Sequence, residues 1–166
     1  MLRCQDDFET FDVMRKSQFL IWDLPLLESY WQDLQEGKAQ GRNLVMEKYA
    51  YMMESTAPKE YEAIATGLPK ISEEKQAMVE QIVAIQVGWR EEFAEKYPHL
   101  SGQARIIHTS EDTLYDISFE TYLRGELKTY SMQTLVLYGR RIVAFVQEQK
   151  NMTEEIMRYT TAFLWL

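Results

Sequence analysis

The chain has 166 residues, of which 46% are hydrophobic and 27% are charged, and its net charge is −8. This length and composition predict a folded protein with one hydrophobic core and exclude a disordered or fibrous chain. The acidic excess argues against nucleic acid as a partner, because the phosphate backbone would be repelled.

Cysteine content and hydropathy indicate the compartment. Cys4 is the only cysteine, which excludes an intrachain disulfide and a zinc site with paired cysteines. The sequence shows no signal-peptide pattern and no apolar run of membrane-spanning length. We therefore expect a soluble protein of the reducing cytoplasm, with no membrane role.

The first part of the chain predicts three helices. The first covers about residues 7–22, and Asp23 then caps a second helix, with Pro25 in its first turn, that reaches about residue 40. A break at residues 41–43 follows, and Asn43 caps a third helix to about residue 54. Apolar residues recur at helical spacing throughout.

The middle of the chain predicts a short helix and a long one. Pro58 begins the short helix, and residues 67–69 interrupt the chain. Ser72 caps a long helix over residues 73–96, which ends before Pro98. A loop is expected from residue 99 to about residue 110.

The last part repeats the pattern of the first. Ser131 occupies the capping position that Asp23 has earlier, and a break at residues 150–151 precedes a final helix. The fold class is all-α, a bundle of about six to eight helices in a single domain, 1–166. The apolar carboxyl end predicts either a trimmed chain or a docked last helix.

A repeated tetrad suggests a duplication. Phe8-Glu9-Thr10-Phe11 resembles Phe119-Glu120-Thr121-Tyr122, and downstream residues match at a constant separation of 108, among them Leu27 with Leu135 and Tyr30 with Tyr138. We predict repeat-like halves at 7–54 and 118–166, with a helical insert at 55–117. Coincidence between two amphipathic segments is the alternative.

The densest polar segment covers residues 108–126 and supplies most candidate ligand-binding residues. Helix entry explains part of it, with Thr109 or Ser110 as cap. Asp116 and Glu120 are four residues apart, so we expect them on one helical face, where their like charges require a cation between them, or an arginine such as Arg124. The ligand-binding candidates are Glu9, Arg15, His108, Asp116, Glu120 and Arg124.

A metal site is a sharper hypothesis. A duplication could bring Glu9 and Glu120 to face each other, with Glu47 and Glu155 from the following helices. Oxygen ligands favour Mg²⁺ as the cofactor, with ligand phosphates completing its shell. The Glu-x-x-His pattern of di-iron bundles is absent.

No catalytic set is recognisable. His108 could act as a general acid or base, although a lone loop histidine is more often incidental. Cys4 lies beside Arg3, but Asp6 and Asp7 oppose formation of a thiolate. The sequence has no Gly-rich phosphate loop and no Ser/His/Asp arrangement, so no reaction is assigned.

Several strings resemble a bacterial family, domain of unknown function 4125. They are Cys4-Gln5-Asp6-Asp7, Met14-Arg15-Lys16-Ser17-Gln18-Phe19, residues 41–49, Met52-Met53-Glu54-Ser55-Thr56-Ala57-Pro58 and residues 109–127. The resemblance covers nearly the whole chain and transfers no activity. It implies a further helix upstream of Met1 and an accessory role beside nucleotidyltransferase-like domains.

Two functional hypotheses follow. In the first, a polar pocket between the repeats binds a small ligand, phosphorylated in one version, with carboxylates holding a metal or cationic group and arginines holding anionic oxygens. In the second, the chain is a non-catalytic module whose acidic surface and apolar carboxyl end bind another protein domain or a second subunit. Oligomeric state is not assigned.

Overall fold

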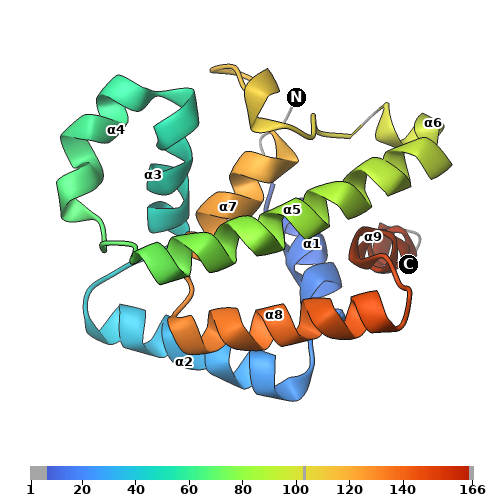
Figure 1. Ribbon diagram of the computed structural model, residues 1–166, viewed down its shortest axis with the longest axis horizontal. Coiled ribbons are helices and arrows are strands. Elements are labelled where there is room, and N and C mark those ends of the chain that lie inside the picture. The colour runs from blue at the N-terminus through green and yellow to red at the C-terminus, as the bar shows by residue number, and fades with distance from the viewer. Residues whose placement is uncertain (1–6, 103, 165–166) are drawn as a thin grey trace.

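A computed structural model describes residues 7–102 and 104–164 (Figure 1). Arg3, Cys4, Asp6 and the last two residues of the apolar carboxyl end, which enter the predictions above, lie outside these residues. The described residues form helices and no strand, which confirms the all-α fold class. The elements are α1 (Phe8–Leu20), α2 (Leu24–Ala39), α3 (Leu44–Thr56), α4 (Pro58–Ile64), η1 (Ala65–Gly67), α5 (Glu73–Lys96), α6 (Pro98–Ser101), η2 (Thr109–Glu111), α7 (Phe119–Thr129), α8 (Met132–Gln147) and α9 (Met152–Leu164).

Side-chain caps determine where most of these helices begin. Asp23 accepts a hydrogen bond from the backbone N–H of Leu26, and Ser131 accepts one from Thr134. Asn43 and Ser72 cap α3 and α5 in the same way. A polar side chain at this position bonds a backbone N–H that has no partner within the helix. The predicted starts of α2, α3, α5 and α8 are therefore confirmed.

The region between α5 and α7 differs from the prediction. The expected loop contains α6 and η2, and the helix that carries Glu120 begins only at Phe119. Its cap is Ser118, whose hydroxyl accepts the N–H of Thr121 at 3.1 Å. Thr109 and Ser110 open a single 3₁₀ turn instead. Asp116 consequently precedes α7, and the prediction that it shares a helical face with Glu120 is wrong.

The first three and the last three helices pack against each other in a crossed arrangement. Helix α2 lies along α8, α1 packs against α9, and α3 packs against α7, while the long α5 crosses the molecule beside α7, α8 and α9 (Figure 1). The bounds of α8 are those of α2 moved by 108 residues, and α9 begins 108 residues after α3. These matched positions and pairings agree with a duplication, which stays a prediction.

Buried aromatic side chains connect the two halves. The Trp22 ring lies 5.5 Å from that of Tyr30, 6.1 Å from that of Tyr130 and 5.7 Å from that of Tyr138, between ring centroids. All four side chains are buried. Because aromatic pairs bury large apolar areas in edge-to-face contacts, this cluster fixes α2 against α8 and the end of α7.

Within the described residues, no helix combines the length and the apolar composition that crossing a membrane requires.

Candidate functional site

A polar pocket lies among α3, α5, α7 and the loop that contains η2. Its volume is about 350 Å³. The lining combines hydroxyl, amide, carboxylate and cationic groups: Tyr51, Glu54, Ser55, Gln76, Glu80, Thr109, Thr121, Arg124, Gly125 and Lys128. Helices α3, α5 and α7 are far apart in the sequence, and only folding brings them together around this pocket.

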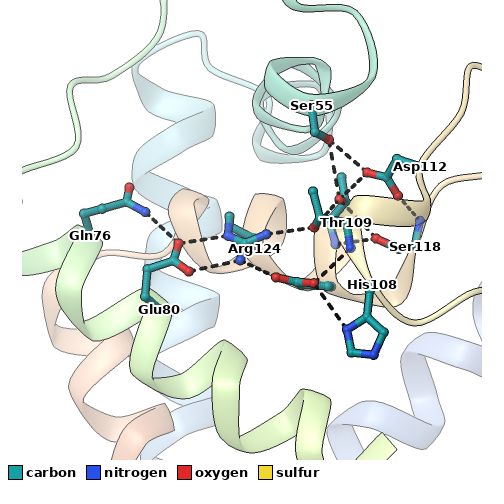
Figure 2. A network of polar contacts seen from close by, with 10 residues as sticks. Ser55, Gln76, Glu80, His108, Thr109, Asp112, Ser118 and Arg124 are labelled. Atoms are coloured by element: carbon teal, nitrogen blue, oxygen red, sulfur yellow. Dashed lines mark hydrogen bonds and ion pairs between the residues drawn. The ribbon is translucent and has the colours of Figure 1, made fainter. Parts of the chain in front are cut away.

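Arg124 is the centre of the polar network in this pocket (Figure 2). Its Nε and Nη2 donate to the two oxygens of Glu80 at 2.8 and 3.0 Å. Nη2 also donates to Glu120 at 2.7 Å, and Nη1 donates to the hydroxyl of Thr109 at 3.0 Å. Burial alone would lower the pKa of Arg124, but its hydrogen bonds to Glu80 and Glu120 raise it. The guanidinium is thus held in place by four hydrogen bonds.

Glu120 lies on the other side of Arg124. Besides its bond to Arg124, its carboxylate accepts the backbone N–H of Thr109 at 2.9 Å. Burial would raise the pKa of Glu120, but these hydrogen bonds outweigh it and lower the pKa. The ion pair between Glu120 and Arg124 that the sequence suggested is therefore present, and Glu80 is a second carboxylate partner that sequence reasoning missed.

Hydroxyl groups converge on Asp112 next to this network. The Asp112 carboxylate accepts hydrogen bonds from the Ser55 hydroxyl at 2.9 Å, from the Thr121 hydroxyl and from the backbone N–H of Ser118 at 2.7 Å (Figure 2). The hydroxyls of Thr109 and Thr121 are 2.9 Å apart. Asp112 therefore joins the loop to the start of α7 and to the end of α3.

His108 lies at the edge of the network. Its Nε2 is 2.9 Å from Glu91 on α5, and its Nδ1 is 3.9 Å from Glu120. The residues just before His108 lie alongside the start of α7, because Phe119 and Glu120 donate their N–H groups to the carbonyls of Ile106 and Ile107. His108 thus contributes to holding the loop over α5 and α7.

Lys128 provides the second cation of the pocket. Its ammonium is 2.8 Å from Glu54 and 5.7 Å from the centre of the Tyr51 ring. The Lys128 side chain is 7% exposed, whereas that of its partner Glu54 is 56% exposed. The ammonium group therefore lies inside the pocket, and the Glu54 carboxylate lies on its solvent side.

Arg15 lies elsewhere, in a buried ion cluster. Its guanidinium donates to both oxygens of Glu126, at 2.8 and 3.2 Å, and Lys48 lies 2.9 Å from the same carboxylate. Burial would raise the pKa of Glu126, but Lys48 and Arg15 lower it to about 2. Sequence reasoning missed Glu126 and Lys48. The signal was available, because Arg15 and Glu126 both lie seven residues after the first residue of a tetrad.

Of the six ligand-binding candidates, the structure brings three together: His108, Glu120 and Arg124. Glu9 is exposed on the first turn of α1, and Asp116 is exposed in the loop before α7. The backbone N–H of Asp116 donates to the hydroxyl of Thr113, and its carbonyl accepts the N–H of Thr113. These two carboxylates do not join the Arg124 network.

The four proposed metal ligands do not form a cage. Glu47 binds Arg42 through both oxygens, Glu120 binds Arg124, Glu155 is 3.8 Å from Arg158, and Glu9 is exposed. Among the described residues, no group of three or more His, Cys, Asp or Glu side chains could hold a metal ion. The physical reason is that α1 and α7 meet at Arg15 and Glu126, about 9 Å along each helix from Glu9 and Glu120.

A search of curated proteins and a search of solved structures each found no match to the chain. A family model, described as "Protein of unknown function (DUF4125)", matches residues 1–164. This match covers all the described helices and supports the resemblance seen in the sequence. The chain is a member of the DUF4125 family.

Proposed function

We propose that the pocket among α3, α5 and α7 binds a small, unphosphorylated polar molecule that carries hydroxyl or amino groups. The protein would act as a ligand-binding protein of the cytoplasm. The observation that carries the proposal is the state of Arg124, whose guanidinium is already occupied by the protein's own acceptors inside a pocket of about 350 Å³.

The charge balance of the pocket disfavours an anionic ligand. An arginine has five N–H donors, and four of those of Arg124 are engaged with Glu80, Glu120 and Thr109. Lys128 is paired with Glu54. A phosphate would have to displace a carboxylate from one of these two cations. A site built for phosphate instead offers it N–H donors that have no other partner.

The same groups favour a ligand that donates hydrogen bonds. The side chains of Glu80 and Glu54 are 43% and 56% exposed, so their oxygens remain accessible to a hydroxyl or an ammonium group. The Ser55 hydroxyl donates its proton to Asp112, so its oxygen is left to accept a hydrogen bond from such a ligand. Fixed polar groups of this kind determine the orientation of a ligand because their own hydrogen bonds hold them in place.

A thermal-shift screen tests the proposal. Sugars, amino sugars, nucleosides and polyamines are each compared with a phosphorylated or acidic counterpart, and melting is measured because a ligand of the folded state raises the melting temperature. At least one unphosphorylated compound should raise it more than its counterpart does.

Matched variants locate the effect. Glu80→Gln removes a pocket carboxylate charge, and Glu74→Gln changes an exposed glutamate on the same helix that does not line the pocket. The shift should be lost in Glu80→Gln and kept in Glu74→Gln. Stabilisation by phosphorylated compounds alone, or equal shifts in both variants, would refute the proposal.

The second hypothesis from the sequence, a module that binds another protein through its acidic surface and apolar carboxyl end, stays a prediction.

A further inference from the structure

A second groove, apolar in character, lies between α5 and α8. Its volume is about 410 Å³, and it shares no lining residue with the polar pocket. Ile82 and Ile142 form its floor and are 4% and 1% exposed. Met78 and Ile85 line it from α5, and Val136 and Val143 line it from α8.

The apolar lining reaches the surface. Ile85 is 39% exposed and Val143 is 52% exposed, so a partner could cover further apolar area there. The groove lies where the first half of α5 passes α8, and the two helices diverge beyond it (Figure 1). An apolar groove between two helices can take the apolar face of a third helix.

The charge in the groove indicates which kind of helix fits. Arg140 is the one charged side chain among the residues that line it, and no carboxylate does so. In the described part of the chain, no hydrogen bond or ion pair of Arg140 is found, and its side chain is exposed. An unpaired arginine on an acidic protein is complementary to a carboxylate of a partner.

We infer that the α5–α8 groove binds an amphipathic helix of a partner protein, with apolar residues over Ile82 and Ile142 and an acidic residue against Arg140. A second copy of the chain fits less well. In a symmetric dimer through this groove, the same patch would meet itself and its lining would offer Arg140 no carboxylate, and each copy carries a net charge of −8.

A displayed library of helical peptides provides the probe. Peptides that bind the full chain are selected, sequenced and synthesised, and their affinities are measured by fluorescence anisotropy. Selected peptides should carry apolar residues at helical spacing and an Asp or Glu. Sedimentation of the free chain should show a monomer.

Two valines give a matched pair of variants. Val143→Asp places a charge in the groove, while Val146→Asp changes a valine that is 51% exposed on the same helix outside it. Far-UV circular dichroism and melting temperature verify that both fold. Val143→Asp should weaken peptide binding at least tenfold, and Val146→Asp should change it less than twofold.

A charge exchange tests the role of Arg140. Arg140→Glu should weaken binding of a selected acidic peptide, and a peptide with Lys in place of its acidic residue should recover the loss. The inference is overturned if no selected peptide is weakened by Val143→Asp, if the exchange gives no recovery, or if Val143→Asp abolishes a dimer of the free chain.

Discussion

Arg15 and Glu126 occupy the same position in the two tetrad-bearing segments, 111 residues apart, and their side chains form a bidentate buried ion pair. If the chain arose by duplication, the pair lies near the axis that relates the two halves. One copy then carries the cation and the other the carboxylate. The two halves therefore carry opposite charges at this position, because two arginines or two glutamates here would repel each other.

Removing the Glu126 carboxylate should destabilise the protein strongly. Glu126→Ala leaves Arg15 and Lys48, whose side chains are each only 16% exposed, without their counter-ion, and we expect a loss of about 3–5 kcal/mol in the free energy of unfolding. Urea denaturation measures it. Asp12→Ala, which breaks the exposed pair with Lys16, should cost less than about 1 kcal/mol. Equal losses in the two variants would contradict this assignment.

Glu126 should also make stability depend on acid pH. Its pKa falls from 4.5 to about 2 on folding. Because the folded value is the lower one, the stabilisation is present above about pH 4.5 and is lost as the pH falls toward 2. The amount is roughly 3 kcal/mol. Glu120 and Glu154 also have lowered pKa values, so the relevant quantity is a difference between variants.

The measurement compares the wild type with Glu126→Gln by denaturation between pH 7 and pH 2. Stability should fall more steeply in the wild type than in Glu126→Gln over the acid range. Parallel curves would show that Glu126 does not titrate differently in the folded and unfolded states.

Gly125 should tolerate no side chain. A Cβ there would lie 2.8 Å from Met52 Cγ and 3.0 Å from the carbonyl oxygen of Lys48 on the adjacent helix α3. Gly125→Ala should therefore cost about 1–3 kcal/mol through overpacking. Gly88→Ala in α5, where nothing lies within 4 Å, should be neutral or stabilise by up to about 1 kcal/mol. Chemical denaturation distinguishes the two, and a neutral Gly125→Ala would contradict the close packing.

The Ser118 cap should contribute more than an exposed cap. Ser118 is fully buried, its hydroxyl caps α7, and its N–H binds Asp112. Ser118→Ala should cost about 1–2 kcal/mol, and Ser72→Ala, at the exposed start of α5, about 0.5–1 kcal/mol. Thermal melting of both variants tests this order, and the reverse order would refute it.

Local signals predicted the helices well. Asp23, Asn43, Ser72 and Ser131 each cap a helix through their own side chain, so their effect does not depend on distant residues. The start of α7 was missed because Thr109, Ser110 and Glu111 look like a cap and an acidic first turn. In the fold they form a 3₁₀ turn, and the Asp112 carboxylate is occupied by Ser55, Thr121 and Ser118.

The candidate site could be predicted only in part. The bond between Glu120 and Arg124 is local, four residues apart on one helix, and the sequence indicated it. Glu80 and Arg124 are 44 residues apart, and their pairing depends on how α5 packs against α7. Glu9 was expected at the site because of the repeated tetrad, and Asp116 because charged residues are dense around it. Neither signal determines where α1 and the loop before α7 lie in the fold.

A titration of the ¹⁵N-labelled chain with the unphosphorylated panel, followed by amide spectra, tests the central claim most directly. We predict that at least one compound shifts the amide signals of Ser55, Thr109 and Gly125 in a saturable way, and that Glu80→Gln abolishes the shifts. The account is contradicted if these signals respond only to phosphorylated compounds, or to none in the panel.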